Sequence, residues 1–136
     1  METPRKFGRE VLSDCIFCGI QEERVVSETS LFIVVRDLFP VSHLHTLIFP
    51  KRHVGTYFDL DTKELSELND VLQQQRVDIL RNDNTVSGFN IGINVGEDAG
   101  QTIFHCHVHL IPRRKGDTPN PQGGVRGVIA GKQKYK

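Results

Sequence analysis

Three histidines occupy alternate positions late in the chain, at His105, His107 and His109. Because successive side chains of a β-strand point to opposite faces, this spacing predicts that the three imidazoles share one face of a strand. The intervening residues Cys106 and Val108 would then face the core. A neutral imidazole is both a nucleophile near pH 7 and a zinc ligand. The row therefore predicts either chemistry at phosphorus or a metal site.

The length of the row bears on this choice. From His105 to His109 a strand advances roughly 13 Å, whereas zinc binds each nitrogen at about 2.0–2.1 Å. One ion could hold all three imidazoles only on a bent strand. The middle residue, His107, is flanked by two imidazoles that can bind phosphate oxygens. We therefore predict that His107 is a nucleophile that attacks phosphorus and forms a phosphoramidate.

The elements around this row predict an α+β fold. Runs rich in apolar and β-branched residues predict four strands, at 31–35, 45–49, 89–95 and 104–111. Leucines and isoleucines at helical spacing predict one long helix between residues 60 and 81. Asp61 and Glu64 form a capping-box pattern at its start. We expect an antiparallel sheet with one long helix packed on it.

Length and composition are those of one small domain. Cationic and anionic side chains balance at 17 each, and 38% of the 136 residues are hydrophobic, which suffices for a single core. We expect a single domain over 1–136 with a basic tail at 113–136 that contains glycine and proline. That tail carries seven Lys or Arg residues against one Asp. It could attract an anionic ligand, or it could be a solvated end.

The sequence also bears on location and partners. No apolar run is long enough to span a membrane, and the N-terminal residues have no signal-peptide pattern. We expect a cytoplasmic protein without a membrane or nucleic-acid partner.

Two of the three cysteines form a C-x-x-C pair, Cys15 and Cys18. In a reducing compartment this spacing suggests metal or redox chemistry before a structural disulfide. No second pair of ligands follows at zinc-finger spacing. Local sequence therefore leaves a metal site, a redox pair and chance open.

Three blocks, in this order, resemble the histidine triad (HIT) family of nucleotide hydrolases and transferases. They are the C-x-x-C at 15–18, the segment at 45–53, and the segment at 88–113, which contains the pattern H-φ-H-φ-H-φ-φ with φ apolar. The ending Leu-Ile-Pro-Arg-Arg is similar to that of the bacterial diadenosine-polyphosphate-cleaving branch. The resemblance implies the same α+β fold, commonly extended across a homodimer. It also implies attack on the α-phosphorus of a purine nucleotide through a nucleotidyl-histidine.

The resemblance also assigns roles by position. It implies that His107 is the nucleophile, that His109 stabilises charge on the α-phosphate, and that His45 orients the nucleophile. Phosphate-side contacts are implied for Asn94, Gly100 and Thr102, a ribose contact for Asp37, and nucleobase contacts for Ile16, Phe17 and Leu38. It implies a closed, structural zinc site formed by Cys15, Cys18, His53 and His105. No cofactor is implied for the chemistry itself.

One residue departs from the family pattern, and one other class of function stays open. The residue before His45 is Leu44, where the family normally has glycine.

The alternative function is a regulatory module that binds an adenine nucleotide without turnover. The intact histidine row favours the enzyme, because binding alone requires no nucleophile. A redox or zinc-storage protein built on the C-x-x-C would leave that row unexplained.

Overall fold

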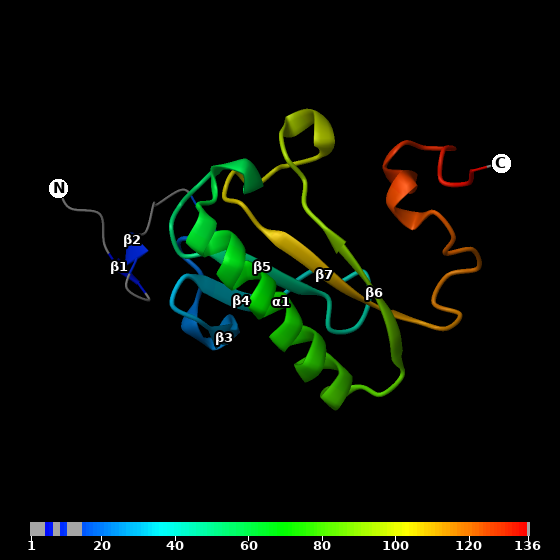
Figure 1. The fold of residues 1–136 in the computed structure, drawn as a ribbon, viewed down its shortest axis with the longest axis horizontal. Coiled ribbons are helices and arrows are strands. Elements are labelled where there is room, and N and C mark those ends of the chain that lie inside the picture. Colours follow the sequence, from blue (N-terminus) through cyan, green and yellow to red (C-terminus); the bar gives the residue numbers. More distant parts are fainter. Residues whose placement is uncertain (1–4, 7–8, 11–14, 136) are drawn as a thin grey trace.

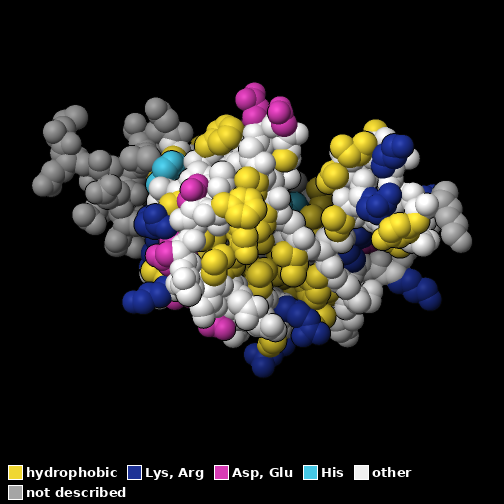
Figure 2. Space-filling view, turned by 45° about the horizontal axis from the view of Figure 1, so that its top comes forward, with side chains coloured by type: hydrophobic (Ala, Val, Ile, Leu, Met, Phe, Trp, Pro, Cys, Tyr) yellow, Lys and Arg dark blue, Asp and Glu magenta, His cyan; other side chains and the backbone are white. Residues whose placement is uncertain are grey.

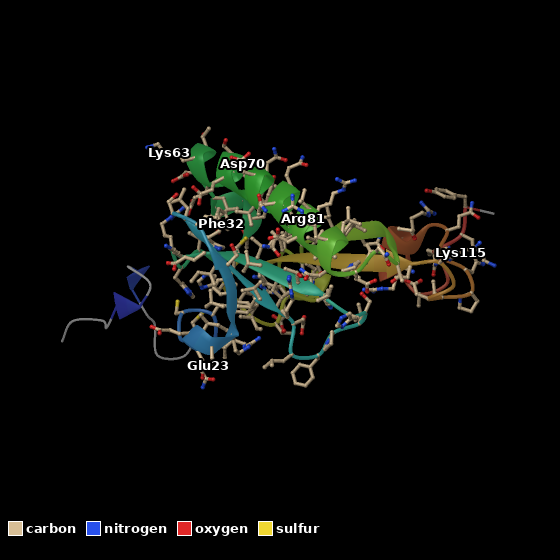
Figure 3. All side chains as sticks on the ribbon, turned by 90° about the horizontal axis from the view of Figure 1, so that it is seen from below. Glu23, Phe32, Lys63, Asp70, Arg81 and Lys115 are labelled. Atoms are coloured by element: carbon tan, nitrogen blue, oxygen red, sulfur yellow. The ribbon has the colours of Figure 1, made fainter. Side chains whose placement is uncertain are left out.

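The computed structural model describes residues 5–6, 9–10 and 15–135 (Figure 1). Its centre is a five-stranded sheet of order β3-β4-β5-β7-β6, in which all neighbouring strands are antiparallel. The strands are β3 (Val25–Glu28), β4 (Phe32–Arg36), β5 (Thr46–Pro50), β6 (Val86–Gly92) and β7 (Val108–Arg114). One long helix, α1 (Thr62–Asn82), packs on one face of the sheet (Figure 3). The predicted α+β architecture is therefore confirmed.

Short elements complete the described chain. β1 (Arg5–Lys6) and β2 (Arg9–Glu10) pair with each other, and four 3₁₀ turns lie at η1 (Glu22–Arg24), η2 (Tyr57–Asp59), η3 (Glu97–Ala99) and η4 (Gly124–Val128). Within the described part of the chain, no helix is both long and apolar enough to cross a membrane.

Both faces of the sheet are buried along β4 and β5, which explains why these two strands are almost wholly apolar. Alternate residues of β4 divide between two clusters: Phe32 and Val34 pack under α1, whereas Ile33 and Val35 pack on the opposite face. That second face is covered by residues 15–20, through buried side chains such as Phe17. Residues 15–20 therefore cover one apolar face of the sheet, and α1 covers the other.

The helix begins where the sequence predicts. The Asp61 carboxylate accepts the backbone N–H of Glu64 at 2.8 Å, and the Glu64 carboxylate accepts the N–H of Asp61 at 2.9 Å. This reciprocal capping satisfies two N–H groups that the helix itself leaves unpaired. Glu64 is nevertheless buried, and the Arg52 guanidinium donates to it at 2.6 Å. The first turn of α1 is thereby tied to the segment that follows β5.

The structure differs from the predicted strands at the histidine row. The strand β7 begins only at Val108, so His105 and His107 precede it in irregular backbone. There the N–H of Cys106 donates to the carbonyl of Val54 at 2.7 Å, instead of joining the sheet ladder. The predicted alternation survives, because Cys106 and Val108 are both buried in the cluster under α1. The histidines therefore share the opposite face without sharing one strand.

Other strands also differ from the prediction. β6 ends at Gly92 rather than at residue 95, and β3 is absent from the predicted elements. β3 is short and half-exposed, and the Glu67 carboxylate of α1 secures the turn after it. That carboxylate accepts hydrogen bonds from Thr29, Ser30 and the N–H of Leu31. A tertiary contact of this kind has no local sequence signal.

The basic tail begins inside the sheet. Arg113 and Arg114 lie in β7, where they form ion pairs with Asp117 and Asp83. Beyond β7 the chain runs past the β6 edge and folds on itself, with the Arg126 guanidinium 4.7 Å from the centre of the Tyr135 ring (Figure 1). The first two cations of the tail are therefore already paired within the domain.

Candidate active site

A cavity of about 270 Å³ lies on the sheet face opposite α1. The structure brings to it all seven residues predicted to bind a nucleotide, namely Ile16, Phe17, Asp37, Leu38, Asn94, Gly100 and Thr102, together with His107 and His109. Sequence reasoning missed four further lining residues, Arg24, Phe39, Leu47 and Ile103. One end of the cavity is thus apolar, and the other holds imidazoles and a glycine-containing loop.

The tautomer of His107 follows from its hydrogen bond. Its Nδ1 lies 2.9 Å from the carbonyl oxygen of His105. Because a carbonyl oxygen can only accept, Nδ1 must carry the proton in the neutral ring. The lone pair is then on Nε2. The ring is held in place by tilted contact with Phe17, with 5.0 Å between the ring centres. In its neutral form His107 therefore presents a defined lone pair to the cavity that it lines.

Hydrogen bonds also fix the tautomers of His45 and, through it, of His109. The backbone N–H of Val41 donates to His45 Nδ1 at 3.1 Å, so the proton of neutral His45 is on Nε2. That Nε2 lies 2.9 Å from Nδ1 of His109 and 3.5 Å from the Asp37 carboxylate. The Nδ1 of His109 accepts, and its proton is consequently on Nε2. His45 itself is buried behind the cavity and does not line it.

Burial keeps these two rings neutral. It lowers the pKa of His45, against the attraction of the Asp37 carboxylate. Burial, followed by repulsion from His107 and His45, lowers the pKa of His109 to about 4. His109 therefore remains uncharged at pH 7 and can act as a hydrogen-bond donor through Nε2–H.

The departure at Leu44 has a clear conformational outcome. Leu44 has a φ of +70°, the left-handed region that favours glycine. It is the third residue of a turn that His45 closes by donating its N–H to the carbonyl of Ser42 at 3.0 Å. The Leu44 side chain packs beside Ile79 and Leu110. The chain therefore adopts a backbone conformation that favours glycine at this position, while the apolar side chain packs on the core.

The loop between β6 and the histidines is held by Gln101, which sequence reasoning also missed. The buried Gln101 amide accepts the N–H of Gly96 at 2.9 Å and donates to the carbonyls of Gly55 and Ile103. Gly100 has a φ of +91°. The loop therefore needs glycine at this point, and its orientation over the cavity depends on one amide.

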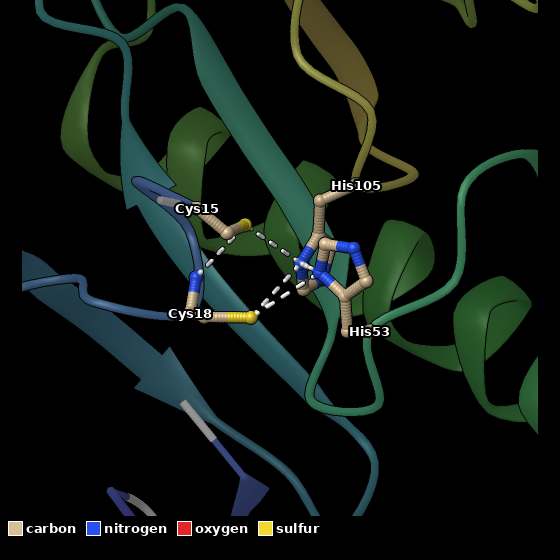
Figure 4. Close-up of side chains that lie close together, drawn as sticks. All are labelled: Cys15, Cys18, His53 and His105. Atoms are coloured by element: carbon tan, nitrogen blue, oxygen red, sulfur yellow. Dashed lines mark hydrogen bonds between the residues drawn. The ribbon is translucent and has the colours of Figure 1, made fainter. Parts of the chain in front are cut away.

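Cys15, Cys18, His53 and His105 also meet, although up to 90 residues separate them (Figure 4). Cys15 Sγ lies 3.3 Å from His105 Nδ1, and Cys18 Sγ lies 3.3 Å from His53 Nδ1. His105 Nε2 donates to the carbonyl of Pro50 at 2.7 Å, which leaves its Nδ1 lone pair facing the sulfurs. The predicted C-x-x-C quartet is brought together.

The donor set fits zinc. Zn–S bonds of about 2.3 Å and Zn–N bonds of about 2.0–2.1 Å place tetrahedral ligand atoms about 3.3–3.8 Å apart. The donor atoms of His53 and His105 are 3.1 Å apart, and Cys18 Sγ is 3.6 Å from His105 Nδ1. Cys106 takes no part: burial, followed by the nearby carboxylates, raises the pKa of its thiol to about 11. It is a core residue, as predicted.

The sheet, the long helix packed on it and the paired imidazoles define a protein of the histidine triad fold. A HIT family protein from Bacillus anthracis has a similar structure, with a TM-score of 0.71 and 36% identity over 77% of each chain. A zinc-bound histidine triad protein from Mycobacterium smegmatis gives a TM-score of 0.68 and 32% identity, over 79% of this chain and 80% of that one.

Sequence comparison identifies the family itself. The HIT domain matches residues 19–116, and the chain therefore belongs to the histidine triad family. A HIT-like protein from Mycoplasma pneumoniae is 35% identical over 105 residues, 74% of this chain and 72% of the relative. A Mycobacterium tuberculosis protein named AP-4-A phosphorylase is 35% identical over 98 residues, 71% of this chain and 50% of that protein. The family includes nucleotide hydrolases and transferases.

Proposed function

We propose that this protein is a nucleotide hydrolase or transferase that attacks the α-phosphorus of a purine nucleotide through His107. The observation that carries this proposal is the hydrogen bond from His107 Nδ1 to the His105 carbonyl, which assigns the lone pair to Nε2. That ring lines a cavity with an apolar end suited to a nucleobase. The family membership supports the same class of reaction.

The reaction proceeds by two displacements. His107 Nε2 forms a bond to the α-phosphorus as the bond to the leaving group breaks, and the leaving group departs with its electron pair. Water then displaces Nε2, so configuration at phosphorus is retained. His109 Nε2–H donates to the α-phosphoryl oxygen while charge develops there, and His45 holds His109 in the tautomer that allows this.

The remaining residues bind the substrate. The hydroxyl of Thr102 contacts a phosphate oxygen, and the Asn94 amide lies on the phosphate or leaving-group side. Gly100 lines the same end of the cavity, but its N–H donates to the carbonyl of Glu97 at 2.9 Å, so the predicted phosphate contact of this amide would require that bond to open. The Asp37 carboxylate binds the ribose hydroxyls. The Asp37 side chain is 16% exposed, and one of its oxygens lies 3.5 Å from His45 Nε2 while the other accepts the N–H of Phe39 at 2.8 Å, which fixes its direction. Ile16, Phe17 and Leu38 enclose the base.

Replacement of the nucleophile tests this proposal. His107→Asn should lower kcat by at least about 10⁴, while nucleotide binding stays within a few-fold. The matched control is His43→Asn, because His43 is an exposed histidine outside the cavity. Rapid quenching of the wild-type protein with α-³²P-labelled nucleotide should trap acid-labile label on the chain. Near-normal turnover by His107→Asn would refute the mechanism.

For the substrate, we propose a phosphoanhydride such as a diadenosine polyphosphate, or a nucleoside phosphoramidate. Support comes from the relative named AP-4-A phosphorylase, although this chain corresponds to only half of it. A panel of diadenosine polyphosphates, adenosine phosphoramidate and aminoacyl-adenylates, ranked by kcat/KM, decides between the branches of the family.

We also propose that Cys15, Cys18, His53 and His105 hold one structural zinc ion. Zinc would stabilise the fold by joining the N-terminal segment to the residues before β7. The purified protein should contain about one zinc per chain, and Cys18→Ser should lose both metal and thermal stability. Cys106→Ala, which removes a thiol outside the cluster, should keep the metal. Metal-free wild-type protein would refute the site. The thiolates it requires persist in a reducing compartment, so we propose a cytoplasmic location.

The β6 edge of the sheet is the surface that we propose for a homodimer. An apolar groove between α1 and β6 is lined by Leu72, Phe89 and Leu110, and Ile91 beside them is 54% exposed. Apolar side chains gather across the middle of the face in Figure 2. An edge strand with unpaired backbone groups offers a second copy continuous pairing. Ile91→Glu should give monomers in light scattering, whereas Val26→Glu on the opposite edge strand should not.

A further inference from the structure

Arg24 lines the cavity, and none of the roles described above uses it. It ends the 3₁₀ turn before β3, and its guanidinium donates to the carbonyl of Arg36 at 3.1 Å. No carboxylate pairs with it among the residues that the structure describes. An Arg side chain has five N–H donors in a planar fork. One hydrogen bond therefore anchors the fork, and its other donors remain available to a ligand.

The sheet order sets the distance of Arg24 from the histidines. Its guanidinium is fixed to the end of β4, and two strand spacings separate β4 from β7, which carries His109. Strands lie about 4.8 Å apart. Arg24 is thus on the order of 10 Å from the proposed phosphate position. Asp37 follows β4 directly and lies between these two points, so Arg24 belongs to the end of the cavity where a base would lie.

The surroundings of Arg24 fit a base rather than a second phosphate. Ile16, Phe17 and Leu38 supply apolar surface at this end, and Asp37 supplies a negative charge that disfavours an anion. A cation placed at the edge of a flat apolar slot can hydrogen-bond to the rim of a base stacked there.

We propose that Arg24 favours guanine over adenine, an inference that rests on the proposed nucleotide function. The guanosine analogue of each proposed substrate would then be preferred to the adenosine compound, which the site would still accept. Two parallel N–H donors of a guanidinium match O6 and N7 of guanine, which are both acceptors. Adenine presents an acceptor at N7 beside a donor at N6, so a guanidinium would face one donor with another. The hydrogen bond to the Arg36 carbonyl limits rotation of the fork, which reduces the entropy lost when it binds.

Substitutions at Arg24 test this assignment. The wild-type protein should bind GMP about tenfold more tightly than AMP, and kcat/KM for guanosine 5′-phosphoramidate should exceed that for the adenosine compound by a similar factor. Arg24→Gln should reverse the order, because a glutamine amide pairs with N6 and N7 of adenine. Arg24→Lys keeps a cationic donor for O6 and N7 but loses the anchored planar fork, so guanine should stay preferred by a smaller ratio of about 3.

The control is Arg81→Ala. Arg81 is an exposed cation at the end of α1, whereas Arg24, next to Glu23, lies on the other side of the sheet (Figure 3). Arg81→Ala should therefore keep the wild-type ratio of GMP to AMP affinity. The ratio of the GMP and AMP affinities measured on one sample does not depend on the folded fraction. Partial unfolding caused by loss of the Arg36 contact would therefore not change this ratio.

Two outcomes overturn the inference, and they can be told apart. Equal affinity for GMP and AMP in the wild-type protein, or an unchanged ratio in Arg24→Gln and Arg24→Lys, removes the role of Arg24 and leaves the nucleotide function intact. Absence of binding and turnover with every nucleotide refutes the proposed function, and the inference fails with it.

Discussion

The left-handed backbone at Leu44 predicts that glycine is more stable than alanine there, the reverse of the usual order. A left-handed conformation costs an L-residue about 1–2 kcal/mol. Alanine at position 44 would keep this cost and glycine would not. Glycine instead lowers the free energy of unfolding by about 0.5–1 kcal/mol relative to alanine, because it loses more conformational entropy on folding. The balance favours Leu44→Gly over Leu44→Ala by about 0.5–1 kcal/mol in the free energy of unfolding.

Both variants also lose the packing of the leucine. Leu44 is half-buried beside Ile79, Val86 and Leu110. Complete burial makes Leu→Ala cost about 2–5 kcal/mol, so a half-buried leucine should cost about 1–2 kcal/mol. We therefore expect Leu44→Ala to be the less stable of two destabilised proteins.

Urea unfolding of both variants measures this order. The matched control is Leu80, which packs on the same cluster from α1, where the backbone is right-handed. There alanine should be more stable than glycine by about 0.5–1 kcal/mol. If alanine were also the more stable residue at position 44, the turn before His45 would not have a positive φ in solution. The account of how His45 is positioned would then fail.

Three further predictions follow from the geometry. Between pH 6.5 and about 4 the unfolded chain binds a proton at His109 that the folded chain does not, so the free energy of unfolding should fall as the pH falls through this window, less steeply in His109→Gln. Equal slopes would contradict it. Glu67→Ala should cost about 1–3 kcal/mol because three donors lose their acceptor, whereas Asp70→Ala on the exposed side of α1 should stay within about 0.5 kcal/mol. Similar losses in both would assign no special role to Glu67. Nitrogen-15 NMR should place the proton of neutral His107 on Nδ1 and that of His45 on Nε2, and the opposite tautomer at either ring would contradict its assigned hydrogen bond.

Local signals predicted much of the fold. The start of α1 depends on a hydrogen-bond exchange between Asp61 and Glu64, three residues apart, and the sequence carries that information in full. The burial of Cys106 and Val108 follows from alternation, which survives even in irregular backbone. The wrong boundary of β7 has a tertiary cause, because the N–H of Cys106 finds its partner at Val54, far along the chain.

The candidate site divides in a similar way. The nucleotide and metal residues were predicted because their order and spacing resemble a family pattern, and their proposed roles stay predictions. Arg24 and Gln101 were missed, since each is a single polar residue whose importance depends on contacts with distant backbone carbonyls. The positive φ at Leu44 was not predicted, because leucine itself gives no local signal for it, although the glycine that the family normally has at this position pointed to an unusual backbone.

The turn at residues 15–18 contributes residues to both the proposed zinc cluster and the cavity. Cys15 and Cys18 face the imidazoles of the proposed zinc cluster, whereas Ile16 and Phe17 between them form a wall of the cavity. Oxidation of the two thiols, or a shortage of metal, would release this wall and with it the Phe17 ring that holds His107 in place. Redox balance and metal supply in the cell would then regulate both substrate affinity and the orientation of the nucleophile. Under a chelator, KM should rise and kcat should fall together.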